Sequence, residues 1–326
     1  MPRQLSDLEK QAFTQLLKNE KKYERLVQKA LADTLTNIRG EMSKIYSKYA
    51  KNGILTRAEM TKYNKYQTME KQILKVLEPA IAKNIATIKR LMPEQYNESF
   101  FRYAWVMDQA VGVNLNYGIL NQNMINELFS ITNPKNIELA NALKNYGPNA
   151  KKYLRNALLQ NLSIGKSYAS MIKDIRIGLN KTYNEAIRLI RTEGQRALNK
   201  AQNDLYLKAM ASGVEGVDIW DATLDGRTRI THRRMDGVKR NEEGYFEPIH
   251  ARYPLDENLP AEEAVNCRCR LRFEIEGYSP QLRRTREQGI IPYQTYEQWE
   301  GGRIKFKTTE GKHKANKTEY EVIKKE

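Results

Sequence analysis

Residues 220–240 read WDATLDGRTRITHRRMDGVKR, and residues 266–275 read NCRCRLRFEI. The second stretch alternates apolar and charged residues, which is the period-two pattern of a β-strand with one face in the core. Its predicted core side is formed by Cys267, Cys269, Leu271, Phe273 and Ile275. A second short strand is predicted to end near Trp220, where Val217 and Ile219 alternate with Asp218. Together these strands predict a small sheet in the C-terminal half of the chain.

Before residue 213 the apolar residues recur at helical spacing instead. Steps of three and four residues connect Leu5 to Leu31 and Met69 to Ile88, with Lys and Glu between them, which predicts long amphipathic helices. Residues 149–212 are predicted to form further helices. The fold class is therefore α+β, with a mostly helical N-terminal region followed by a smaller domain of helices and a short sheet.

Turn-forming residues near Thr132–Pro134 and Tyr146–Pro148 predict a domain boundary in this part of the chain. We expect a helical N-terminal region over residues 1–147 and a domain of helices and a short sheet over residues 148–280. Residues 281–326 are predicted to form a basic, extended C-terminal tail, because their end is rich in Lys and poor in apolar residues.

The chain is strongly basic, with 55 Lys and Arg against 39 Asp and Glu among 326 residues, a formal net charge of +16. Such an excess of positive charge favours polyanionic partners. Because the excess is distributed along the chain, it suits a long, shallow contact with phosphate backbones. Two cysteines indicate a reducing compartment rather than a disulfide scaffold. No signal-peptide pattern or membrane-spanning run is evident, so synthesis in the cytoplasm is expected.

The two cysteines have two interpretations. At positions i and i+2 of a strand their thiols share one side, where they could bind a metal with His232 and with His250 or Asp225 as a fourth ligand. Structural zinc sites usually use paired C-x-x-C elements, however, and small buried residues would equally continue the apolar row. We favour core packing and expect no cofactor. A structural zinc on His232, Cys267 and Cys269 is kept as the alternative.

A catalytic interpretation of the same segment is also open. Asp225, His232 and Asp236 could supply a base and its orienting carboxylate for phosphodiester hydrolysis. No accompanying nucleophile is visible, and Asp225-Gly226 and Asp236-Gly237 are strong turn dipeptides. We therefore expect no catalytic residues and no enzymatic activity. The alternative is a metal-dependent phosphodiesterase or nuclease that uses Asp225, His232, Cys267 and Cys269.

Basic side chains dominate both stretches and are the candidates for nucleic-acid contact. Guanidinium groups bind phosphates in a bidentate way that lysines cannot, and no recognition helix or aromatic stacking platform is evident. Binding is therefore expected to be insensitive to sequence. The predicted DNA-contacting residues are Arg227, Arg229, Arg233, Arg234, Lys239, Arg240, Arg268, Arg270 and Arg272.

Five short motifs occur in a specific order along the chain. They are RTE at residues 191–193, G-x-x-x-W at 216–220, D-x-R-T-R-x-x-H-x-x-x-D-G at 225–237, FEP at 246–248 and NCRC at 266–269. In this order, over about residues 150–275, they resemble the phage Mu F-like minor head protein family, also called the phage head morphogenesis family.

This resemblance implies a minor capsid protein of a tailed phage, without enzymatic activity, that serves capsid assembly and genome packaging and ejection. It implies a location in the virion, in the capsid interior near the portal. The expected partners are the portal protein, scaffold or major capsid protein, double-stranded DNA and further copies of the chain. It looks like a stand-alone minor capsid protein, because no toxin domain follows.

The chain departs from the family at one point. Family members often carry a Cys pair in the loop after the aspartate, where this chain has Arg229 and His232. The positions that still match the family pattern are His232, Cys267 and Cys269.

Overall fold

The computed structural model describes residues 5–62, 65–111, 120–275, 282–285 and 289–292. The chain forms two compact units, one of residues 1–214 and 254–267 and the other of residues 215–253 and 268–326. The first is helical and the second contains the small sheet, so the predicted α+β fold class is confirmed. We call them the helical unit and the sheet unit.

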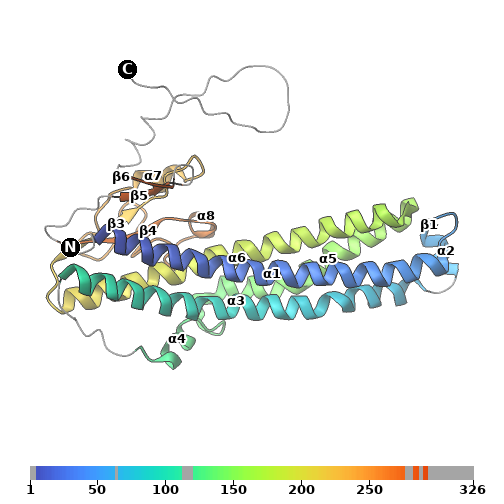
Figure 1. The fold of residues 1–326 in the computed structure, drawn as a ribbon, viewed down its shortest axis with the longest axis horizontal. Helices are drawn as coiled ribbons and strands as arrows, with labels where there is room; N and C mark the ends of the chain where they lie inside the picture. The colour runs from blue at the N-terminus through green and yellow to red at the C-terminus, as the bar shows by residue number, and fades with distance from the viewer. Residues whose placement is uncertain (1–4, 63–64, 112–119, 276–281, 286–288, 293–326) are drawn as a thin grey trace, which may run out of the picture. The chain divides into compact units, whose positions relative to one another are not determined.

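Four long helices build the helical unit (Figure 1): α1 (Leu5–Tyr49), α3 (Tyr66–Val111), α5 (Ile137–Ile164) and α6 (Tyr168–Ala211). Their apolar stripes meet in a shared core, as the helical spacing predicts. Residues buried in this core include Leu16, Tyr23, Ile88, Leu91, Tyr146, Leu158, Ile190 and Leu205.

Most of the shorter elements of the helical unit connect one long helix to the next along the chain. They are β1 (Ile54–Leu55), α2 (Arg57–Lys62), α4 (Gln122–Leu128), the 3-10 helix η1 (Pro134–Asn136), β2 (Lys166–Ser167) and α8 (Ala261–Ala264). Strands β1 and β2 pair antiparallel beside the turn between α5 and α6. Gly165 has φ +72° in this turn, a left-handed conformation that glycine adopts readily.

The sheet unit is built on β3 (Gly216–Asp221), which pairs antiparallel with β4 (Arg270–Ile275). The strand predicted from the NCRCRLRFEI alternation is thus confirmed, although it begins three residues after Cys267. Leu271 and Phe273 are buried, as expected. The loop after β3 contains the short helix α7 (Ile230–Arg234), and its residues 237–240 bond to the backbone of Asp218 and Trp220.

Two features bear on the predicted domain divisions. Residues 147 and 148, where we predict a boundary, lie inside α5. Strands β5 (Leu282–Thr285) and β6 (Gly289–Pro292) pair antiparallel at the start of the predicted tail, and the rest of residues 281–326 lies outside the described residues. The three-part division stays a prediction. None of the helices in the described part combines the length and hydropathy needed to cross a membrane.

Candidate functional site

The loop after β3 is held to the sheet unit through Trp220. This side chain is fully buried and contacts the ring of Phe246 edge-on, with centroids 5.5 Å apart. The imidazole of His232, on α7, meets the indole edge-on from 5.4 Å. Trp220 therefore ties β3 to two separate parts of the loop, and His232 serves as one of its packing partners.

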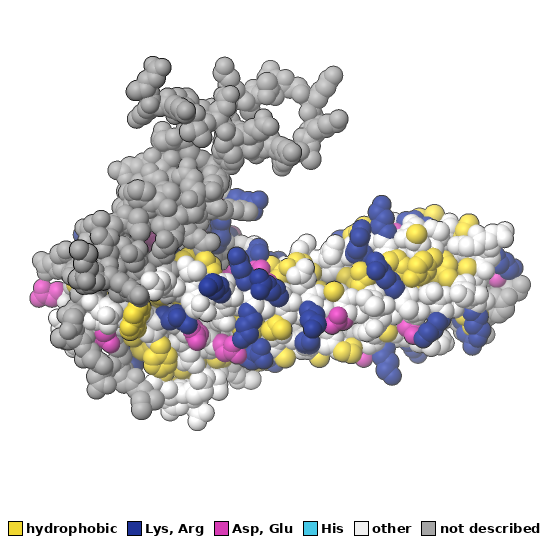
Figure 2. Space-filling model, in the orientation of Figure 1, with side chains coloured by type: hydrophobic (Ala, Val, Ile, Leu, Met, Phe, Trp, Pro, Cys, Tyr) yellow, Lys and Arg dark blue, Asp and Glu magenta, His cyan; other side chains and the backbone are white. Residues whose placement is uncertain are grey.

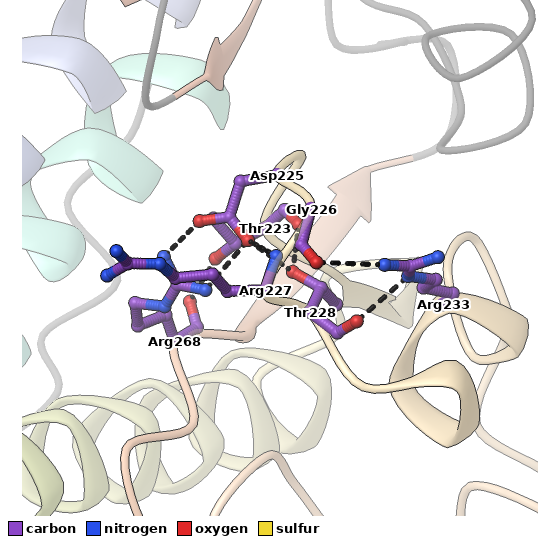
Figure 3. A network of polar contacts seen from close by, with 7 residues as sticks. All are labelled: Thr223, Asp225, Gly226, Arg227, Thr228, Arg233 and Arg268. Carbon is purple, nitrogen blue, oxygen red and sulfur yellow. Dashed lines mark hydrogen bonds and ion pairs between the residues drawn. The ribbon is translucent and has the colours of Figure 1, made fainter. Parts of the chain in front are cut away.

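Asp225 organises the first turn of this loop (Figure 3). Its side chain is buried, and Oδ1 accepts hydrogen bonds from the backbone N–H of Arg227 at 2.9 Å and from the Thr228 hydroxyl at 3.2 Å. Both terminal nitrogens of Arg268 bind the same carboxylate. Burial alone would raise the pKa of Asp225, but Arg268 and these hydrogen bonds hold it below its ordinary value. The turn interpretation of Asp225 is confirmed.

Asp236, the second turn aspartate, also binds backbone. Its Oδ1 accepts a hydrogen bond from the Ala222 N–H at 2.9 Å, just after β3 ends. Of the residues in the catalytic alternative, Asp225 and Asp236 thus each fix a loop to the sheet. Their contacts account for both aspartates in structural terms.

Two further aspartates, both in β3, pair with predicted DNA-contacting arginines. Asp221 lies opposite Arg270 in the strand register, and their side chains form an ion pair at 2.8 Å. Asp218 pairs with Arg240 at 3.1 Å, with both side chains at least 90% buried. Burial raises the pKa of Asp218 to about 6, against the lowering effect of Arg240. The sequence pattern alone indicates no role for either aspartate, although carboxylates in a short buried strand usually require a partner.

The nine predicted DNA-contacting residues therefore do not form one free basic face. Arg268, Arg270 and Arg240 pair with aspartates, and Arg272 pairs with Glu274 at 3.1 Å. Arg233 donates to the backbone oxygens of Thr228 and Gly226 (Figure 3). Arg229 is half-buried, and the exposed residues are Arg227, Arg234 and Lys239. DNA contact by the nine residues stays a prediction, now strongest for the exposed three.

The predicted metal ligands do come together. The ligand atoms of His232, Cys267 and Cys269 lie within 4.8 Å of one another. All three side chains are buried, and His232 Nδ1 is 3.3 Å from Cys269 Sγ. Within the described residues the group has three members, whereas a closed structural zinc site uses four ligands.

The candidates for a fourth ligand are engaged elsewhere. Asp225 is bound by Arg268, as described above. His250 stacks on Tyr245 with centroids 4.1 Å apart and contacts Glu247 at 2.7 Å. The residues present therefore do not fit a closed four-ligand zinc site, and a zinc on His232, Cys267 and Cys269 stays the alternative to core packing.

In the helical unit, α6 uses buried polar side chains to hold residues 254–267. The Asn266 N–H donates to the Thr192 hydroxyl at 3.0 Å, and the Asn199 side chain donates to the Pro254 carbonyl at 2.8 Å. Buried Glu193 pairs with Arg196 at 2.6 Å; its burial raises its pKa against the lowering effect of Arg196. The RTE motif and the residues after it thus position the segment that leads into NCRC. Sequence patterning gave no role to Thr192 or Asn199.

Comparison with known proteins agrees with the motif order. The family model described as "Phage Mu protein F like protein" matches residues 152–272. The chain is 28% identical over 289 residues to "Minor head protein GP7" of Bacillus phage SPP1, covering 85% of this chain and 91% of that protein. No solved structure gives a significant match.

A second relative corrects one expectation. The chain is 27% identical over 284 residues to "NAD(+)--arginine ADP-ribosyltransferase EFV" of Enterococcus faecalis, covering 86% of this chain and 57% of that protein. The prediction of no enzymatic activity is contradicted, since this relative is named as an enzyme. That prediction depended on a missing nucleophile and on the turn interpretation of the aspartates, and neither excludes a transferase.

The family predicted from the five ordered motifs is therefore confirmed. The matched segment includes α6, the β3 and β4 strands and the Asp225 turn, which are the elements that the motifs occupy. A head protein of this kind has a role in head morphogenesis and belongs to the virion. Residues 152–272 match the Phage Mu protein F-like family, and over most of its length the chain is similar to a phage minor head protein.

Proposed function

We propose that this minor head protein joins the capsid interior of a tailed phage near the portal and binds the genome there without sequence preference. The portal protein is its proposed main partner, with scaffold or major capsid protein and further copies of the chain as others. The observation that carries the proposal is the match to Minor head protein GP7 over 91% of that protein. A match over nearly the whole length supports a shared role better than a match to one domain.

Charge supports the genome-binding part of the proposal. The chain carries +16, and Arg227, Arg234 and Lys239 are exposed in the sheet unit. Each phosphate contact releases condensed counterions from DNA, so binding through such residues weakens steeply with salt. Binding of this kind would help to retain the protein on packaged DNA and serve packaging or ejection.

The portal proposal is tested in cells that assemble procapsids of the cognate phage. Tagged protein should be incorporated when wild-type portal is present and should be missing from procapsids assembled without portal. Labelling at one vertex in averaged particle images would give the position directly. Equal incorporation with and without portal would contradict the proposal.

The DNA proposal is tested with purified full-length protein and fluorescent duplexes of two unrelated sequences. We expect equal affinity for both duplexes and a fall of roughly 10³-fold or more between 50 and 200 mM salt, if six or more phosphates are contacted. Affinity that does not change with salt would contradict an electrostatic mechanism. A strong preference for one duplex would contradict non-specific binding.

A further inference from the structure

The outward surface of α5 and α6 carries six exposed basic side chains that pair with no carboxylate among the described residues. We propose that this surface, which we call the α5–α6 basic face, is the main binding surface for double-stranded DNA. It consists of Lys144, Lys152, Lys173, Arg176, Lys181 and Arg188. The inference depends on the proposed DNA binding and assigns it to a part of the chain where the sequence motifs predict no site.

Charge is distributed unevenly among the four long helices. Helices α5 and α6 together carry twelve Lys and Arg against five Asp and Glu, whereas α1 and α3 carry fifteen against eleven. The basic excess of the bundle is thus concentrated in the α5–α6 hairpin. Figure 2 shows Lys and Arg side chains spread along the helical unit, with fewer Asp and Glu between them.

Several cations of α5 and α6 are already neutralised by the neighbouring helices. The three such pairs are Lys151–Glu78, Arg155–Glu70 and Arg191–Glu24. The carboxylates of these pairs belong to α1 and α3, the two long helices that contact the hairpin. They stabilise the bundle and leave the outward cations of α5 and α6 unmatched.

Two carboxylates of α6 that lie near these cations are also engaged. Asp174 accepts from Lys166 at 2.8 Å and from Asn161 at 2.9 Å, while Glu185 accepts from Asn149 at 2.9 Å. In the part of the chain that the structure describes, none of the six side chains of the basic face forms an ion pair with a carboxylate. Their charge is therefore available to an external polyanion.

The hairpin presents these cations on a straight and closely packed support. At Gly178 an added Cβ would lie 3.2 Å from the Tyr153 carbonyl oxygen, so the two backbones touch there. Lys173 and Arg188 lie fifteen residues apart in one unbroken helix, a rise of about 22 Å. A duplex presents one negative charge per ~1.7 Å of its axis, so such a row faces many phosphates at once.

The other exposed residues of this face favour a duplex over a single strand. Single-strand binding uses aromatic side chains as stacking platforms, but no exposed residue of α5 or α6 is aromatic. Exposed amides instead lie between the cations and can donate hydrogen bonds to phosphate oxygens. These are Asn145, Asn156, Asn180 and Asn184.

The test compares two full-length variants with equal loss of charge. The first changes Lys152, Lys173, Lys181 and Arg188 to Gln, and the control changes Lys21, Lys29, Lys71 and Lys83, which are exposed on α1 and α3. Affinity for a fluorescent duplex is measured from 50 to 200 mM salt. Circular dichroism and thermal melting confirm that both variants fold like the wild type.

We expect the first variant to lose at least tenfold in affinity and its salt slope to shrink by about 0.9 for each lost phosphate contact. The control variant should lose much less. Equal losses in both variants, or an unchanged first variant, would overturn the assignment to α5 and α6. Absence of salt-dependent binding by the wild type would instead overturn the proposed DNA binding itself, and the inference with it.

If the four-site variant is unstable, a two-site variant with Lys173→Glu and Arg188→Glu replaces it. Both positions are exposed on α6, so charge reversal there should leave the core unchanged. Its matched control is Lys21→Glu with Lys83→Glu. A weaker duplex affinity in the first pair alone supports the proposal, and the same affinity in both pairs overturns it.

Discussion

The carboxylate of Asp225 accepts hydrogen bonds from both terminal nitrogens of Arg268 and so joins the turn after β3 to the residues that lead into β4. Asp225 is buried, whereas the Arg268 side chain remains 38% exposed. This pair links two motifs that lie about forty residues apart in sequence. The pair explains in structural terms why Asp225 after β3 occurs together with Arg268 of the NCRC motif.

Replacing Asp225 with Asn should therefore destabilise the sheet unit. The change removes a charged acceptor from Arg268 and weakens the turn at Arg227 and Thr228. We expect a loss of about 2 kcal/mol, less than the ~3–5 kcal/mol of a fully buried pair because Arg268 is partly solvated. Urea denaturation measures the loss. Arg227→Gln, at an exposed position, is the control and should change stability by less than about 0.5 kcal/mol.

Asp218 should make the stability of the sheet unit depend on pH in the opposite direction to an ordinary paired carboxylate. Burial raises its pKa from 3.8 to about 6, so the folded state favours the protonated form. The preference adds to the free energy of unfolding, and this stabilisation is complete below about pH 3.8 and is lost as the pH rises through about 6. It amounts to at most about 3 kcal/mol.

The stability difference between wild type and Asp218→Asn tests this linkage. Asn mimics the protonated carboxyl and does not titrate, so the wild type should lose stability relative to the variant between pH 4 and pH 7. Urea denaturation at pH 4, 5, 6 and 7 gives the difference. The same difference at every pH would show that Asp218 keeps an ordinary pKa in the folded state.

Residue spacing predicted the elements well, because burial of an apolar face imposes a period of its own. The alternation from Cys267 to Phe273 and the helical stripes of the bundle are both found. Spacing cannot show which polar residues meet, since the partners come from distant segments. Asp221 with Arg270 and Asn199 with Pro254 are of this kind. Sequence patterning therefore predicts Arg270 and Arg272 of β4 as DNA-contacting residues, whereas the structure shows both in ion pairs with carboxylates.

That pairing changes what is expected of Arg270 and Arg272. Because Arg270 binds Asp221 and the Arg272 side chain is only 12% exposed, changing both to Ser should lower stability by about 1–3 kcal/mol. Thermal melting measures this effect. Arg234→Ser with Lys239→Ser removes the same charge from exposed positions and should leave the melting temperature nearly unchanged. Equal melting of the two variants would contradict a structural role for the strand arginines.

The cysteine and histidine group should hold no stoichiometric zinc in the purified protein. It offers three ligands, and the remaining candidates, Asp225 and His250, are bound by other residues. Metal analysis after expression in zinc-supplemented medium measures the content. One zinc per chain, lost together in Cys267→Ser and Cys269→Ser, would show that a fourth ligand completes the site.

Asn199 should contribute to the attachment of residues 254–267, because its buried side chain donates to the Pro254 carbonyl at 2.8 Å. Asn199→Ala leaves that carbonyl without this donor, at an expected cost of about 1–3 kcal/mol. Asn180→Ala is the matched control, since Asn180 lies exposed on the same helix and shares the helix propensity change. Limited proteolysis should then cleave near residue 254 faster in Asn199→Ala than in the control. Equal cleavage rates would mean that α6 holds this segment without Asn199.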